Sequence, residues 1–96
     1  MAEVVLTPQS LDDVARLIRT HSLPPDTRGR IRRSLAPLGR FPLLGAPLAG
    51  RWSGYRFILG PWRWMILVYV HDADTETVAV VTVQDGRSSA SPTATG

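Results

Sequence analysis

The 96-residue chain contains no cysteine, and none of its cations is a lysine. Without cysteine, the sequence offers no disulfide framework, no thiolate zinc site and no cysteine nucleophile. The two histidines, His21 and His71, stand far apart, and neither has a second metal ligand at a useful spacing. We therefore expect no metal site and no bound cofactor.

Long apolar runs are missing as well. The longest, residues 62–70, is interrupted by Arg63 and is much shorter than the roughly 20 residues that a membrane helix needs. Glu3 follows the first methionine almost directly, and no apolar run precedes a small-residue cleavage site. The sequence therefore predicts a cytoplasmic protein that does not interact with a membrane.

Arginine takes the place of lysine throughout, since all 11 cations are arginines and the formal net charge is +3. The guanidinium group presents a flat fork of donors that binds phosphate or carboxylate through two hydrogen bonds, and it stays charged near neutral pH. This balance favours an anionic partner such as nucleic acid or an acidic polypeptide. On charge alone, a soluble domain that is merely basic is an equally good interpretation.

The first part of the chain predicts one strand followed by two helices. Residues 3–7 are short and β-branched, which is typical of a strand. Thr7 and Pro8 then form a helix start, and apolar residues follow at helical spacing. A second helix begins after the prolines at 24 and 25, and its arginines at 28, 30, 32 and 33 are typical of a solvated face.

The second part predicts three consecutive strands, at about residues 51–59, 64–70 and 78–83. A Gly60-Pro61 turn and a polar hairpin loop at residues 71–75 connect them. The expected fold class is α+β: a small, mostly antiparallel four-stranded sheet with the two N-terminal helices packed on one face. Residues 1–87 form the single domain, and the polar residues 88–96 are expected to be a mobile tail.

The order of these elements resembles the RelE/ParE toxin superfamily over roughly residues 3–89. The resemblance also rests on the GAPLAG connector at residues 45–50, the Gly54-Tyr55-Arg56 entry to a strand and the turn at residues 60–63. It implies the toxin half of a bacterial type II toxin–antitoxin pair, neutralised by a cognate antitoxin protein. RelE-type members cut messenger RNA on the ribosome, whereas ParE-type members poison DNA gyrase.

In the RelE-like nucleases, basic residues surround the scissile phosphate, and the resemblance carries this role to Arg56, Arg63 and Arg87. A second basic position of the family falls on Ile58, which cannot serve. Where such nucleases often have a tyrosine or histidine after the last arginine, this chain has serines, beginning with Ser88.

Metal-free RNA cleavage also needs groups that move protons, and arginine is poorly suited to that. Asp85, two residues before Arg87, is the candidate, although a salt bridge to Arg87 is the better interpretation because the arginine would lower its pKa. We interpret His21 as a structural residue, His71 as a solvated residue of the hairpin loop and Tyr69 as part of the core.

Trp62 and Trp64 are two residues apart and could stack on RNA bases, although for Trp64 we favour a place in the core.

Three functions remain open. The first is a toxin that binds RNA and arrests growth, one form being a metal-independent mRNA endonuclease that uses Arg56, Arg63, Arg87 and Asp85. The second is a non-catalytic ParE-like toxin acting on DNA gyrase, and the third is a degenerate, non-toxic family member that serves as a binding module. The first hypothesis requires the three guanidinium groups to converge on one open patch of the sheet.

Overall fold

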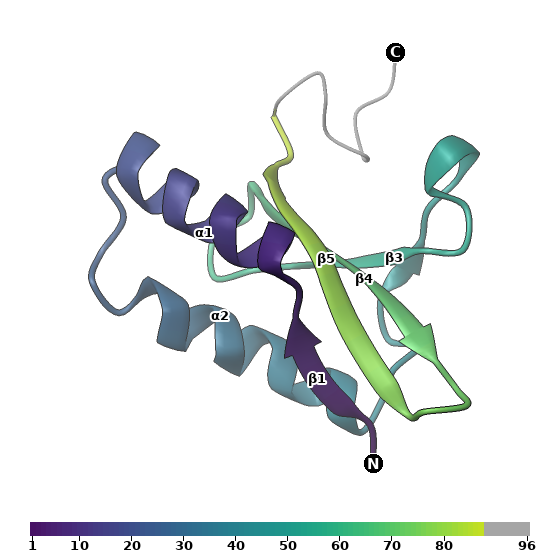
Figure 1. Cartoon of the computed structure of the whole chain (residues 1–96). Helices are drawn as coiled ribbons and strands as arrows, with labels where there is room; N and C mark the ends of the chain where they lie inside the picture. Colours follow the sequence, from purple (N-terminus) through teal and green to yellow (C-terminus); the bar gives the residue numbers. More distant parts are fainter. Residues whose placement is uncertain (88–96) are drawn as a thin grey trace.

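The computed structural model describes residues 1–87, so the tail expected at residues 88–96 lies outside the described residues. Figure 1 shows the two helices together on one side of a twisted sheet. In chain order the elements are β1 (Glu3–Leu6), α1 (Pro8–Thr20), α2 (Thr27–Leu35), the 3₁₀ turn η1 (Ala36–Gly39), β2 (Ala46–Pro47), the 3₁₀ turn η2 (Gly50–Trp52), β3 (Arg56–Leu59), β4 (Met65–Asp72) and β5 (Thr77–Asp85). The predicted α+β class is confirmed.

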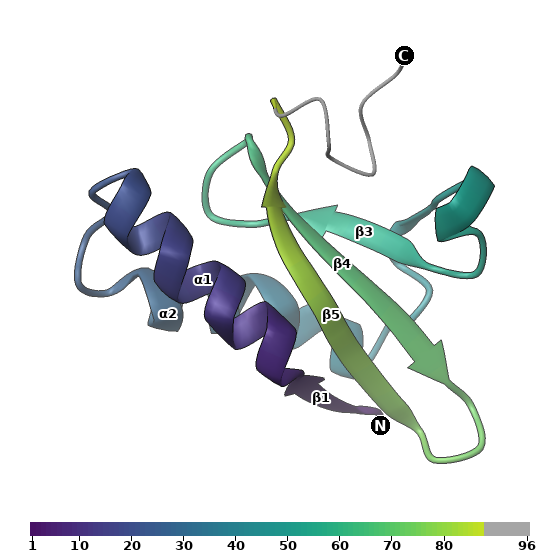
Figure 2. The same cartoon turned by 45° about the horizontal axis from the view of Figure 1, so that its top comes forward.

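The five strands lie in the order β1-β5-β4-β3-β2, with β1 parallel to β5 and the other pairs antiparallel. The parallel pairing places the first strand of the chain beside the last. One β-bulge interrupts the β4–β5 ladder: Val68 pairs with Thr82 and Tyr69 with Val80, which leaves Val81 as the extra residue on β5. Figures 1 and 2 show α1 beside β5.

The sheet differs from the sequence prediction at its β2–β3 edge. The expectation of four strands is wrong by one, because Ala46 and Pro47 pair with β3 as a two-residue strand. Proline has no N–H to give to a ladder, so this segment carries no strand signal in the sequence. The predicted start of β3 at residue 51 is also wrong, because Gly50 and Gly54 adopt positive φ angles and residues 50–52 form η2.

Both helices pack on one apolar cluster beneath the central strands. Its buried members are Val14 and Leu17 of α1, Ile31 and Leu35 of α2, Leu38 of η1, Met65, Leu67 and Tyr69 of β4, and Val78, Val80 and Val83 of β5. Ile66 and Val68, which alternate with the β4 members, are also buried although they lie outside this cluster. The prediction that residues 64–70 hold a central strand covered on both faces is therefore confirmed for residues 65–69.

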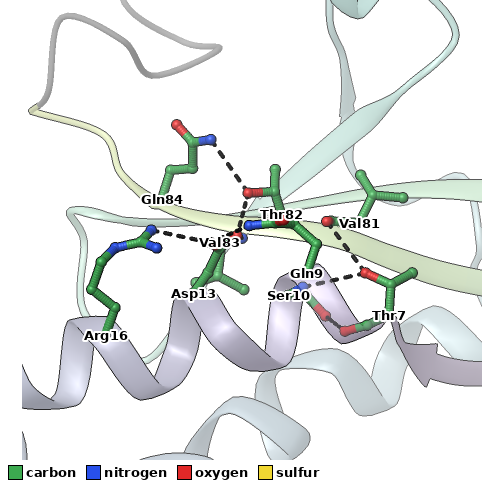
Figure 3. Close-up of polar contacts among 9 residues, drawn as sticks. All are labelled: Thr7, Gln9, Ser10, Asp13, Arg16, Val81, Thr82, Val83 and Gln84. Carbon is green, nitrogen blue, oxygen red and sulfur yellow. Dashed lines mark hydrogen bonds and ion pairs between the residues drawn. The ribbon is translucent and has the colours of Figure 1, made fainter.

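The expected start of the first helix is confirmed. Thr7 adopts an extended conformation, and its Oγ1 accepts a hydrogen bond from the Ser10 N–H at 3.3 Å, which is the geometry of an N-cap. The same hydroxyl donates to the Val80 carbonyl on β5 at 2.9 Å. Thr7 therefore ends β1, begins α1 and ties both to β5 (Figure 3).

A buried carboxylate makes the second connection between α1 and β5 (Figure 3). Asp13 is only 2% exposed, and its Oδ2 accepts hydrogen bonds from the Thr82 hydroxyl and from the Val83 N–H at 3.1 Å. Its Oδ1 accepts from Gln9 at 2.9 Å and from Arg16 at 3.0 Å. Burial by itself raises the pKa of Asp13, but these hydrogen bonds outweigh it and hold the pKa below the ordinary value.

Neither helix within residues 1–87 is long and apolar enough to span a bilayer. The arginines of α2 lie on its exposed side, as expected from their run in the sequence, and Arg30 pairs with Asp26 at 3.0 Å.

We predict that Asp13→Asn lowers the free energy of unfolding at pH 7 by about 1–3 kcal/mol, because the neutral amide cannot accept all four hydrogen bonds. The folded-state pKa of Asp13 is depressed, so this contribution is present above the unfolded-state pKa and is lost as the pH falls through the folded-state pKa. Urea unfolding should therefore show a difference in the free energy of unfolding between wild type and variant, and this difference should become smaller below about pH 4. Asp12→Asn, at the exposed neighbouring position, is the control and should leave the stability unchanged.

Candidate functional site

The turn between β3 and β4 and the end of β5 meet at one end of the sheet. Met65 begins β4 opposite Asp85, and the Gly86 N–H donates to the Trp64 carbonyl at 2.6 Å. Arg63, in the turn just before Met65, and Arg87, just after Asp85, therefore lie at the same end of the molecule. We call this end, comprising His21, residues 62–64 and residues 85–87, the basic rim.

Asp85 is the centre of the basic rim. Its Oδ1 accepts hydrogen bonds from the Arg87 Nε at 3.0 Å and from the Arg87 backbone N–H at 2.9 Å. Its Oδ2 accepts from Arg87 Nη2 at 2.9 Å and lies 3.0 Å from His21 Nε2. The Asp85 carboxylate, at the end of β5, thus connects Arg87 with His21, the residue that follows the end of α1.

This network determines the charge of Asp85. The Arg87 guanidinium beside it is the main reason that the pKa of Asp85 lies far below its ordinary range, with smaller contributions from the Arg87 N–H and from His21. Asp85 in turn raises the pKa of Arg87. Both groups therefore stay charged at any working pH. This outcome matches the interpretation of Asp85 as a salt-bridge partner and disfavours it as a general base.

His21 was interpreted from the sequence as a structural residue, and the structure adds a contact that the sequence did not indicate. An ionised carboxylate can only accept a hydrogen bond, so the His21 nitrogen that faces Asp85 carries the proton. The lone pair of the other nitrogen, Nδ1, then accepts a hydrogen bond from the hydroxyl of Thr20 at 2.9 Å. The residues in contact, His21 and Asp85, are 64 positions apart, and no local pattern connects them.

Two tryptophans stack with side chains of the basic rim and of α2. The Trp64 ring stacks on the His21 ring at 4.6 Å between centroids, and the Arg87 guanidinium lies 5.1 Å from the Trp64 ring centre. Trp62 stacks on Trp64 at 6.1 Å and receives Arg30 of α2 at 5.7 Å. Both tryptophans are partly buried and pack against the core cluster. Their ring faces are thus occupied by other side chains, which agrees with the core interpretation of Trp64 better than with base stacking.

The structure brings Arg63 and Arg87 to the basic rim but not Arg56. Arg56 pairs with Tyr69 four residues along β4 from Met65, a strand distance of about 13 Å. Its Nη1 donates to the carbonyls of Gly45 at 2.8 Å and Leu43 at 3.3 Å. Arg56 thus holds the connector before β2, and the expected convergence of three guanidinium groups is reduced to two.

Arg63 differs from its neighbours in the rim because it is exposed and takes part in none of the ion pairs within residues 1–87. The rim therefore combines one guanidinium open to solvent with one held by a carboxylate. Among the described residues, no three histidine, aspartate or glutamate side chains gather closely enough to hold a metal ion.

Comparison by sequence alone finds no matching family model and no match among curated proteins. Comparison of folds finds solved structures. A chain of the RelBE2 toxin–antitoxin complex from Mycobacterium tuberculosis is 26% identical, with a TM-score of 0.59, over 88% of this chain and 96% of that one. The YoeB/ParE toxin from Agrobacterium tumefaciens is 22% identical, with a TM-score of 0.66, over 86% and 96% of the two chains. The isolated RelE toxin of E. coli is 16% identical, with a TM-score of 0.64, over 94% and 89%.

These likenesses span nearly the whole length of both chains in each pair. The chain therefore has the fold of a toxin from a toxin–antitoxin pair. That fold is the one of the RelE and YoeB/ParE toxins, so the resemblance to the RelE/ParE superfamily expected from the sequence is confirmed at the level of the fold.

We predict that Arg87→Ala raises the pKa of Asp85 toward the ordinary value of 3.8, because the variant loses the largest cause of the depression. Titration of the side-chain carboxyl carbon by NMR measures this directly. Arg63→Ala removes an equal charge at the same rim without removing a contact of Asp85, so it should leave the pKa of Asp85 unchanged. An unchanged midpoint in the Arg87 variant would contradict the described ion pair.

Proposed function

We propose that this protein is the toxin of a type II toxin–antitoxin pair and that it acts as a ribosome-dependent, metal-independent mRNA endonuclease. The observation that carries the proposal is the basic rim, where Arg63, Arg87 and His21 gather at the end of the sheet in a RelE/ParE fold. Two oxygens of a phosphate group can accept the same pair of parallel hydrogen bonds that the Asp85 carboxylate accepts from the Arg87 guanidinium.

In the proposed mechanism, the scissile phosphate takes the place of Asp85 on the Arg87 fork, and Arg63 binds it from the exposed side. The two guanidinium groups stabilise the negative charge that grows on the phosphate as the neighbouring 2′-hydroxyl attacks. The proton of the 2′-hydroxyl passes to Nδ1 of His21, the bond from phosphorus to the 5′-oxygen breaks, and the leaving 5′-oxygen takes a proton from water. The products are a 2′,3′-cyclic phosphate and a 5′-hydroxyl.

His21 is the residue that we assign to proton transfer in place of Asp85. A carboxylate on Nε2 fixes the tautomer, as in histidine–aspartate pairs of hydrolytic enzymes, so that Nδ1 has the lone pair that accepts a proton. Among residues 1–87, the hydroxyl of Thr20 is the one group that forms a hydrogen bond with Nδ1, and the Thr20 side chain is exposed. A 2′-hydroxyl in the position of this Thr20 hydroxyl would donate to the same lone pair.

A second candidate function is a non-catalytic toxin of the ParE type that acts on DNA gyrase. It is favoured by the same contacts, because Asp85 and Thr20 occupy both nitrogens of His21 and Asp85 fills the fork of Arg87. In this alternative the rim is a rigid charged surface that recognises a protein.

We predict that induced expression arrests growth and that incorporation of labelled amino acids falls before incorporation of labelled thymidine. Arg63→Ala should relieve the arrest, because removal of one donor to a developing oxyanion slows a reaction by about 10²–10³-fold. His21→Gln should also relieve it. The control is Arg51→Ala, at an exposed arginine of η2, which should stay toxic.

An early fall in thymidine incorporation would instead support the gyrase alternative. Full toxicity of both Arg63→Ala and His21→Gln, with translation still the first process to fail, would exclude the proposed roles of these residues in the rim.

A further inference from the structure

Three large apolar side chains project into solvent from the segment between η1 and β2. Phe41, Leu43 and Leu44 are 59%, 61% and 58% exposed, within four residues of one another. Single exposed leucines are ordinary in small proteins, but a continuous apolar patch of this kind marks an interaction surface. We call this segment, residues 40–44, the apolar connector.

The backbone of the apolar connector is held in place from both ends. The Phe41 N–H donates to the Pro37 carbonyl at 2.8 Å, and the Leu44 N–H donates to the Phe41 carbonyl at 3.0 Å. Just after the connector, the Gly45 N–H donates to the hydroxyl of the buried Tyr69 at 2.8 Å.

Arg56 completes this support, since its guanidinium donates to the carbonyls on either side of Leu44. Gly45 is required at its position, because a Cβ there would lie 2.6 Å from the Phe57 carbonyl oxygen and 2.8 Å from the Tyr69 ring. The connector is therefore fixed against the sheet while its apolar side chains point outward. A surface that is already ordered loses little conformational entropy when a partner binds it.

The apolar connector borders an open hollow of about 480 Å³. The hollow is lined by Arg40, Phe41, Pro42, Leu43, Leu44 and His71. Arg40 is exposed and belongs to none of the ion pairs within residues 1–87. A concave apolar surface with one cation at its border fits an apolar segment that carries a carboxylate.

We infer that the apolar connector is a docking surface for an acidic amphipathic helix of the antitoxin, and this inference rests on the function proposed above. Strand addition fits poorly, because the neighbouring edge strand β2 has two residues and Pro47 has no N–H to donate. A second copy of the chain also fits poorly, because pairing of two identical patches would bring Arg40 toward Arg40 in a protein whose net charge is already +3.

The same inference gives Arg56 a positioning role. The sequence resemblance places Arg56 at the scissile phosphate, whereas its hydrogen bonds place it under the docking surface.

The test mixes the full chain in solution with the product of any small reading frame that flanks its gene, the two proteins having been purified separately. Leu43→Asp and Leu44→Asp should each weaken the complex by about 10- to 100-fold, which corresponds to the loss of one buried leucine. Arg40→Glu should slow association and reduce its dependence on salt. Leu11→Asp is the matched control, because Leu11 is a leucine of α1 that is 49% exposed and lines a separate cleft between α1 and α2. Thermal unfolding verifies that each variant is folded.

Several results would overturn the inference. Equal binding by the wild type and both leucine variants would do so, as would no binding by the wild type or a loss that Leu11→Asp shares. A wild-type dimer that Leu43→Asp converts to a monomer would show that the occupant is a second copy. A wild type that does not arrest growth would instead overturn the proposed toxin function, so the two failures are distinguishable.

Discussion

The buried carboxylate of Asp13 determines where α1 lies on the sheet. A charge with almost no exposure is tolerated only when each oxygen finds donors, and here two of the four donors come from Thr82 and Val83, directly after the β-bulge. The bulge at Val81 changes the register at this point, so that the backbone N–H of Val83 faces the helix instead of the β4 ladder. The end of β5 and the end of α1 then meet, which makes the contact between Asp85 and His21 possible.

Three arginines that resemble one another in the sequence have different surroundings in the structure. Arg87 is neutralised by a carboxylate and lies on an aromatic ring, Arg63 is exposed, and Arg56 binds backbone carbonyls. Strand register separates them, because Arg63 and Arg87 flank the paired residues Met65 and Asp85, whereas Arg56 is paired four positions further along β4. Positive charge alone does not distinguish an arginine that could bind phosphate from an arginine that supports the backbone.

Much of the fold follows from local patterns in the sequence. The Thr7-Pro8 helix start, the two-sided apolar strand at residues 65–69 and the polar hairpin after it are each carried by neighbouring residues. The proximity of Arg63 and Arg87 also follows, since a tight β3–β4 turn and an antiparallel β4–β5 pair bring them to one end.

The remaining features depend on contacts between distant residues. The pairing of β2 involves a proline and only two residues, so the sequence carries no strand signal at this position. The position of His21 depends on where α1 lies against β5, and Thr7 and Asp13 both form hydrogen bonds to β5. The hydrogen bonds of Arg56 depend on the close approach of the Gly45 backbone to β3. In each case the information lies in tertiary packing, which periodicity does not report.

The parallel pairing of β1 with β5 has a consequence for synthesis on the ribosome. Glu3 through Leu6 find their partners only at Thr77 through Val80, so the sheet cannot close until most of the chain has been translated. Until then, α1 has no β5 to pack on, and neither Asp85 nor Arg87 exists to meet His21. A nascent or prematurely terminated chain therefore lacks the basic rim, which can form only after the last strand has emerged.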